Sequence, residues 1–146
     1  MTKHEKVMDI LNKSIARELA VAIQYMWQHV VAEGISSPPI AEMFREIAIQ
    51  EMKHAERFAE RLNYFDGMPT TKPTEIKVAE KLTKMIADDM AAEEEAIRLY
   101  KQAIKLAIEL DDPVTRLLYE EILGDEEDHW DKFRTLLEKA AKVDLI

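Results

Sequence analysis

The chain carries the same set of acids, histidine and tyrosine twice, at one constant spacing. In the first set, Glu18 and Tyr25 precede the pair Glu51 and His54. Adding 75 to each number gives the second set, which consists of Glu93, Tyr100, Glu126 and His129. Two glutamates and two Glu-x-x-His pairs, one of these on each of four helices, are the ligand set of a carboxylate-bridged di-iron or di-manganese centre inside a four-helix bundle. The repeat therefore predicts a duplicated helical hairpin around one metal centre.

Long stretches without glycine or proline predict an all-α fold with a single domain over residues 1–146. The short links within each hairpin predict antiparallel neighbours, and the longer link near Pro69 and Pro73 predicts one long crossover between the second and third helices. The expected helices span about residues 3–33, 38–66, 75–110 and 113–143.

The composition excludes several kinds of function. The chain has no cysteine, which excludes a disulfide framework, a Cys-based zinc site, an iron–sulfur cluster and a thiol nucleophile. Its net charge of −9 argues against a nucleic-acid partner, because phosphate contacts need a basic patch. The N-terminus lacks the apolar run of a secretory signal, and no stretch approaches the roughly 20 apolar residues of a membrane span. We therefore expect a cytoplasmic protein without a membrane partner.

Each repeated acid lies in the middle of an apolar helix face. Steps of three and four residues follow one face of a helix, and Ile15 and Glu18 share such a face. Among Glu93, Glu94 and Glu95, only Glu93 continues the apolar face of its helix and obeys the repeat. Burial of an unpaired carboxylate costs several kcal/mol or more, so four converging carboxylates need cations.

Two divalent metal ions would balance the four carboxylates, with neutral imidazoles completing the shell. An oxygen-rich site with one nitrogen per metal suits iron or manganese better than copper or structural zinc. We expect Glu51 and Glu126 to bridge the two metals, with Glu18 and Glu93 terminal and one histidine on each metal. The predicted metal ligands and catalytic residues are Glu18, Glu51, His54, Glu93, Glu126 and His129.

Tyr25 and Tyr100 lie on the same faces, two turns beyond Glu18 and Glu93. We expect each hydroxyl to hydrogen-bond the terminal carboxylate of the opposite half. Both tyrosines would then take part in catalysis through the ligand carboxylates, without contacting the metal ions themselves. The alternative is an ordinary core tyrosine whose hydroxyl needs a partner.

The run Glu51-Met52-Lys53-His54-Ala55-Glu56 resembles the bacterioferritins, the haem-containing branch of the ferritin superfamily. The resemblance extends from Leu11 to His129 and so covers nearly the whole chain. It implies a ferritin-like four-helix bundle and a ferroxidase centre built from the six ligands above, holding two Fe ions per subunit, with Mn as an alternative. The implied activity is oxidation of Fe(II) by O2 or H2O2, for iron storage and detoxification.

The resemblance also implies a role for Met52, which breaks the internal repeat because its counterpart is Glu127. Bacterioferritins bind haem b between two copies of this methionine across a twofold dimer interface. An ordinary apolar interface residue is the alternative. The sequence reaches Ile146 soon after His129, so the fifth helix of the family is not evident. We therefore expect a homodimer, and the family's 24-subunit cage stays an alternative.

Two other functions stay open. A rubrerythrin-like dimeric di-metal peroxide reductase, or another oxidoreductase without mineral storage, would need no fifth helix. However, rubrerythrins add a further glutamate ligand and usually a cysteine-rich electron-transfer domain, and this chain has no cysteine. A structural helical dimer with a relic site is the remaining alternative, and the intact set of six ligands argues against it.

Overall fold

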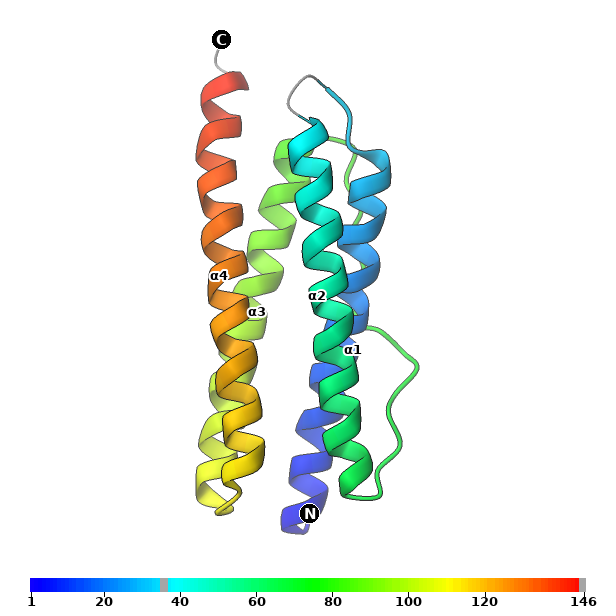
Figure 1. Ribbon diagram of the computed structural model, residues 1–146, viewed down its shortest axis with the longest axis vertical. Coiled ribbons are helices and arrows are strands. Elements are labelled where there is room, and N and C mark those ends of the chain that lie inside the picture. The colour runs from blue at the N-terminus through cyan, green and yellow to red at the C-terminus, as the bar shows by residue number, and fades with distance from the viewer. Residues whose placement is uncertain (35–36, 145–146) are drawn as a thin grey trace.

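The computed structural model describes residues 1–34 and 37–144, with side chains described as far as residue 138. Figure 1 shows four long α-helices packed side by side, with the two ends of the chain at opposite ends of the bundle. The described part of the chain contains no strand, so the predicted all-α four-helix bundle is confirmed. The helices are α1 (Lys3–Val31), α2 (Ser37–Tyr64), α3 (Leu82–Glu109) and α4 (Pro113–Asp144).

Local sequence explains where several helices begin and end. The Thr2 side chain and the Glu5 side chain each bind the other residue's backbone N–H, which forms a capping box at the start of α1. At the start of α4, the Asp112 carboxylate accepts a hydrogen bond from the backbone N–H of Thr115. Beyond the last turn of α2, the Gly67 N–H donates to the Leu62 carbonyl at 3.0 Å and closes the helix end.

The third helix begins later than the sequence predicted. The expected range was 75–110, whereas α3 starts at Leu82, and the other helix ends lie within two residues of the prediction. The segment between α2 and α3 is instead an extended crossover tied to α1. The Thr74 N–H donates to the Ala16 carbonyl at 3.2 Å, and the Lys77 N–H donates to the Gln24 side-chain oxygen at 2.9 Å. These bonds to α1 satisfy backbone groups that a helical turn would otherwise have paired.

The core consists of two apolar clusters separated by a charged layer. One cluster contains Leu11, Phe58 and Tyr100, and the other contains Tyr25 and Phe133. The two clusters follow the internal repeat, because Phe58 meets Tyr100 edge-on at 5.4 Å between ring centroids and Phe133 meets Tyr25 in the same way at 5.5 Å. The repeated acids and histidines lie between these clusters, sealed on both sides by aromatic rings.

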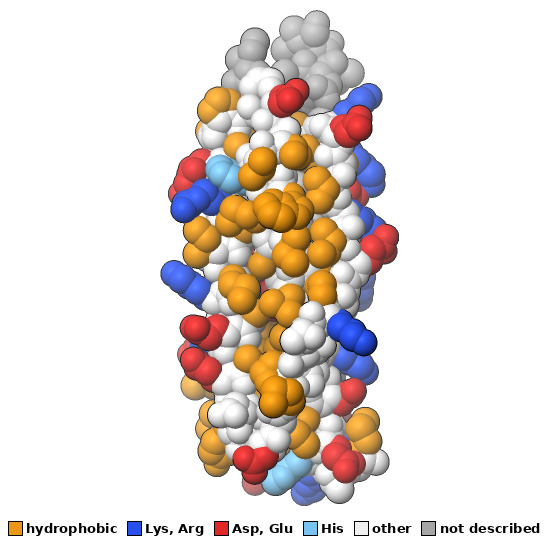
Figure 2. Space-filling view, turned by 90° about the vertical axis from the view of Figure 1, so that its right-hand side faces the viewer, with side chains coloured by type: hydrophobic (Ala, Val, Ile, Leu, Met, Phe, Trp, Pro, Cys, Tyr) orange, Lys and Arg blue, Asp and Glu red, His pale blue; other side chains and the backbone are white. Residues whose placement is uncertain are grey.

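Some large apolar side chains stay exposed on the first hairpin. Figure 2 shows an apolar band along one face of the bundle, with charged side chains on both flanks. The exposed large apolar residues of α1 and α2 include Trp27, Val30, Val31 and Met52. None of the four helices, as far as the structure describes them, combines the length and the apolar character of a membrane span.

Candidate metal centre

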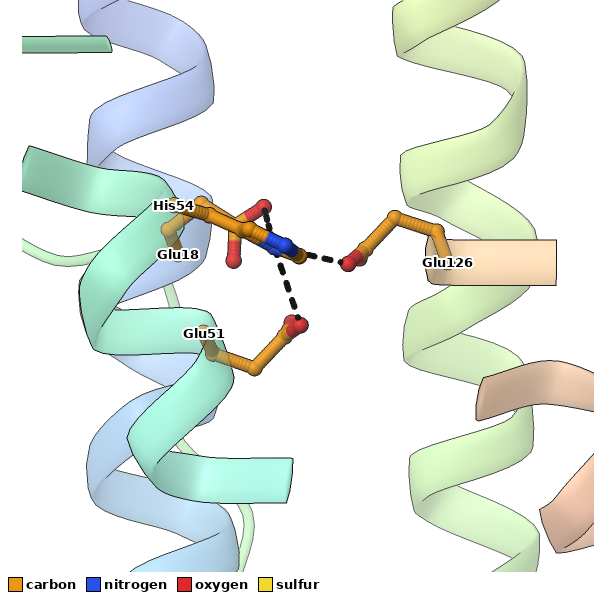
Figure 3. A group of neighbouring side chains, drawn as sticks. All are labelled: Glu18, Glu51, His54 and Glu126. Atoms are coloured by element: carbon orange, nitrogen blue, oxygen red, sulfur yellow. Dashed lines mark ion pairs between the residues drawn. The ribbon is translucent and has the colours of Figure 1, made fainter. Parts of the chain in front are cut away.

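The structure brings together all six side chains that the sequence predicted as ligands. Each of the four helices contributes to the group, and every member is buried with at most 3% of its surface exposed. Figure 3 shows Glu18, Glu51, His54 and Glu126 pointing toward one another from three helices, α1, α2 and α4. Apolar residues at the neighbouring positions of each helix face place these polar groups inside the bundle, as the period of the sequence indicated.

The six side chains form two overlapping groups of four. Glu18 and His54 belong to the first group, and Glu93 and His129 belong to the second. Glu51 and Glu126 belong to both groups, and within each group one ligand atom per residue lies within 4.8 Å of the others. This arrangement provides two adjacent positions for cations, and the two positions share the carboxylates of Glu51 and Glu126.

The spacing of the inward-facing atoms suits a metal ion at each position. His54 Nδ1 lies 3.0 Å from Glu126 Oε1, 3.3 Å from Glu51 Oε1 and 3.5 Å from Glu18 Oε1. Metal bonds of about 2.1 Å place neighbouring ligand atoms about 3.0–3.4 Å apart, depending on the geometry. His129 Nδ1 is similarly surrounded, at 3.1 Å from Glu51 Oε1 and 3.6 Å from Glu126 Oε1.

Each of the six residues also has one buried polar atom without a hydrogen-bond partner among the described residues. An unsatisfied buried polar group costs about 1–3 kcal/mol, so six in one place need an explanation. A cation bound between them would supply the missing partner, and the mixed oxygen and nitrogen donors fit iron or manganese. The atoms are Glu18 Oε2, Glu51 Oε1, His54 Nδ1, Glu93 Oε2, Glu126 Oε1 and His129 Nδ1.

Hydrogen bonds from behind fix the orientation of both imidazoles. His54 Nε2 donates to Asp125 Oδ2 at 2.8 Å, and His129 Nε2 donates to Gln50 Oε1. A proton held on Nε2 leaves the Nδ1 lone pair facing the centre of the site, where a metal ligand needs it. The sequence reasoning missed these two partners, although Gln50 and Asp125 occupy equivalent positions in the internal repeat.

The two tyrosines make the hydrogen bonds that the repeat predicted. Tyr25 Oη donates to Glu93 Oε1 at 2.8 Å, and Tyr100 Oη donates to Glu18 Oε1 at 2.5 Å. Each bond links one half of the repeat to the terminal carboxylate of the other half. Burial, together with the nearby carboxylate charges, raises the pKa of both tyrosines well above 10, so both hydroxyls stay protonated donors.

Arg17 is a member of the site that the sequence reasoning did not identify. Its guanidinium lies among the four carboxylates, with Nη1 2.7 Å from Glu51 Oε2 and in contact with Glu126 Oε2. It also lies 3.3 Å from Glu18 and from Glu93. Burial lowers the pKa of Arg17, but the four carboxylates outweigh burial and raise it well above its usual value. A permanent positive charge is therefore part of this site.

The four carboxylates of the site hold their charges unequally. Burial, followed by the charge of Glu51, raises the pKa of Glu18 to about 7. Burial and the charges of the other three glutamates raise the pKa of Glu126 well above its usual value. Burial also raises the pKa of Glu51, but the charge of Arg17 and the two nearby imidazoles outweigh burial and leave that pKa well below its usual range. Burial and mutual repulsion therefore oppose the charged forms of Glu18 and Glu126, whereas Glu51 stays charged.

This fold and this site define a class of protein: the ferritin-like helical bundle with a carboxylate–histidine centre. A profile of the ferritin-like domain matches residues 8–143. The bacterioferritin of Desulfovibrio desulfuricans is 38% identical over 125 residues, which is 85% of this chain and 70% of that protein.

Solved structures agree with the sequence comparison. A crystal structure of Desulfovibrio desulfuricans bacterioferritin, described by its diiron site in different catalytic states, matches with a TM-score of 0.91 and 32% identity over 96% of this chain and 82% of that one. Rhodobacter capsulatus bacterioferritin, described with a metal-free dinuclear site and haem iron, matches with a TM-score of 0.90 and 28% identity over 94% of this chain and 87% of that one. The present chain belongs to the bacterioferritin family.

Proposed function

We propose that this chain is a ferroxidase that oxidises Fe(II) to Fe(III) at an intrasubunit di-iron centre, for iron storage and detoxification. The observation that carries the proposal is the set of six buried ligand residues in two overlapping groups, each with one buried polar atom that has no hydrogen-bond partner among the described residues. Membership of the bacterioferritin family supports it, as does the diiron site named for the Desulfovibrio relative. In the cell, ferrous iron and O2 or H2O2 would be the reactants.

The position of each ligand residue in the two groups indicates which metal ion it would bind. Glu51 and Glu126 belong to both groups and would bridge the two ions, while Glu18 with His54 and Glu93 with His129 would complete one position each. Bound iron would supply one electron per ion as Fe(II) becomes Fe(III), and two such electrons with two protons reduce one H2O2 to two water molecules.

The residues around the six ligands would fix the ligand orientations and exclude water. Asp125 and Gln50 hold the imidazoles in the tautomer that presents Nδ1, and the tyrosine hydroxyls each hold one carboxylate oxygen, Oε1, of Glu18 and Glu93. The two aromatic clusters exclude bulk water from the charged layer, which strengthens every electrostatic contact inside it.

Iron oxidation kinetics test this proposal. We expect Glu18→Ala and His54→Ala to slow rapid Fe(II) oxidation at least tenfold and to lower metal binding below two ions per chain. Glu120→Ala is a matched control, because Glu120 pairs with Arg116 on the exposed surface of α4. Variants of Glu18 and His54 that oxidise iron at the wild-type rate would eliminate this site as the ferroxidase centre.

We also propose that Met52 is an axial haem ligand, shared between two copies of the chain. Met52 follows Glu51 on α2, but its side chain is 51% exposed and so points away from the metal centre. Exposed Trp27 and Val30 on the neighbouring helix α1 make the first hairpin apolar enough to suit a flat porphyrin and a second copy. The haem iron named for the Rhodobacter relative supports the same assignment.

Reconstitution with haem b tests the role of Met52. Met52→Leu should abolish the Soret band of the haem-loaded protein, whereas Met68→Leu, a change at an exposed methionine of the crossover, should leave the band intact. An unchanged band in Met52→Leu would show that the assignment is wrong. Light scattering of the same samples would distinguish a dimer from a larger assembly, such as a 24-subunit cage.

A further inference from the structure

Arg17 occupies a position that the di-iron centre does not require. Among the described residues, it is the one arginine or lysine in the buried set, with 6% of its surface exposed. Its Nη1 atom lies 2.7 Å from Glu51 Oε2 and touches Glu126 Oε2, and these are the two carboxylates shared by both groups of ligands. The guanidinium thus lies against the groups that two metal ions would share.

The charges show why a retained guanidinium conflicts with a fully loaded site. Four carboxylates supply four negative charges, and two divalent cations supply four positive charges. A guanidinium held among the same carboxylates leaves an excess of one positive charge in a buried site, which is costly without a further anion. In the structure the guanidinium instead pairs with all four carboxylates, alongside the imidazoles of His54 and His129.

Arg17 also breaks the internal repeat. Its counterpart in the second half is Ala92, and Arg17 Nη2 donates to the Ala92 carbonyl at 3.2 Å. One half of the site therefore supplies a long cationic side chain, and the other half supplies a methyl group and a backbone acceptor. A single guanidinium serves all four acids of the pseudo-symmetric centre.

A cavity beside Arg17 offers a second place for the guanidinium. Its volume is about 130 Å³, and Arg17 itself forms part of its wall. The cavity lies where α1, α3 and the crossover meet, and three carboxylates line it, those of Glu75, Asp88 and Glu95. Apart from Arg17 itself, Lys77 adds the one positive side chain of this lining, and Lys84 pairs with Asp88 from outside it. An arginine rotated into this space would keep anionic neighbours within reach.

We propose that Arg17 is a displaceable counter-ion, which holds the four glutamates together in the metal-free protein and withdraws into the acidic cavity when two divalent metal ions bind. This inference rests on the proposed function for the identity of the metal centre. Metal ions then compete with the guanidinium of Arg17, so metal binding is weaker than the six ligands alone would give. The same guanidinium keeps the four-helix bundle folded when no metal ion is bound.

Zinc binding to the chelator-treated full chain tests this inference, because Zn²⁺ binds the same ligand types and is not oxidised. Arg17→Met removes the charge but keeps a long unbranched side chain. We expect it to raise the affinity for Zn²⁺ at least tenfold and to lower the melting temperature of the metal-free protein, while the zinc-loaded variant melts no lower than zinc-loaded wild type. Arg134→Met, at an exposed ion pair of α4, is the matched control and should change neither quantity.

A double-mutant cycle tests where the guanidinium goes. Glu95→Gln removes one exposed carboxylate of the cavity, and we expect it to weaken zinc binding in the wild-type background but not in the Arg17→Met background. If Arg17→Met does not fold without metal, Arg17→Lys replaces it, because a single ammonium makes fewer bonds to the acids and should still raise the affinity.

The outcomes separate this inference from the proposed function. Weaker zinc binding in the Arg17 variants would overturn it and show that Arg17 only braces the ligands. Failure of wild-type protein and Arg17 variants alike to bind two zinc ions would instead contradict the metal centre itself. Equal effects of Glu95→Gln in both backgrounds would overturn withdrawal into the cavity.

Discussion

The two halves of the metal centre differ in the group that holds each histidine. His54 Nε2 donates to the Asp125 carboxylate at 2.8 Å, whereas His129 Nε2 donates to the neutral amide oxygen of Gln50. A carboxylate partner makes an imidazole a more basic ligand than an amide does. We therefore predict two unequal metal positions, with the first divalent ion binding more tightly on the side of His54.

Asp125→Asn is the perturbation that isolates this effect. An asparagine keeps the size of the side chain and an oxygen acceptor, but it removes the negative charge. Loss of such an outer partner typically costs about 10–100-fold in metal affinity, or about 1.4–2.7 kcal/mol. The Asp125 side chain is 54% exposed, so solvent screening places the expected loss near the lower end, at about tenfold.

Calorimetric titration of the metal-free protein with Zn²⁺ measures the two steps separately. In Asp125→Asn we expect the first step to weaken about tenfold, so that the two steps approach each other. Gln50→Glu is the complementary change, and it should strengthen the second step while leaving the first unchanged. An unchanged first step in Asp125→Asn, or equal weakening of both steps, would refute the reasoning.

Three further predictions concern stability. Tyr100→Phe should destabilise the metal-free protein by about 1.5–3 kcal/mol in urea unfolding, because Glu18 loses a buried charge-assisted hydrogen bond; a change below about 0.5 kcal/mol would contradict this. Phe58→Ala should cost about 3–5 kcal/mol, since this fully buried ring packs between aromatic neighbours in the core. Asp112→Ala should cost about 1 kcal/mol at pH 7 through loss of the α4 cap. Burial raises the pKa of Asp112, but its bonds to Thr115 and Arg61 outweigh burial and lower it, so this contribution is complete above the unfolded pKa of about 3.9 and disappears as the pH falls through the lower folded value. Equal destabilisation by Asp112→Ala at pH 7 and at pH 2 would argue against the cap as the cause.

The sequence predicted the six clustered side chains because two independent regularities agree on them. Helical periodicity placed Glu93 rather than Glu94 on the buried face, and the repeat selected the same residue. Such reasoning finds residues that point inward along the face of their own helix. It missed Arg17, which precedes Glu18 and lies off that face, because a long side chain can reach back into the core from a neighbouring position. The sequence signal that could have identified Arg17 is a break in the internal repeat, because its counterpart is Ala92.

The late start of α3 has a different physical cause. Residues 75–81 have a composition that suits a helix, so periodicity extended the helix to Glu75. The structure holds this part of the chain extended through hydrogen bonds to Ala16 and Gln24 of α1, which are distant in the sequence. A contact between distant segments leaves no period in the local sequence. The boundary therefore follows from tertiary structure, which overrides local propensity.

The crossover is held to α1 by individual amides rather than by a helix of its own. Thr70 N–H donates to the Asn12 side chain at 2.8 Å, and Thr74 and Lys77 donate to Ala16 and Gln24. Thr74 and Lys77 also border the cavity beside Arg17. Amide hydrogen exchange at these positions consequently measures how often the wall of the cavity detaches from α1, at single-residue resolution and without a probe in the metal centre. If the wall must loosen for the guanidinium to move, the exchange rates of these amides set an upper limit on how fast the site can be loaded and emptied.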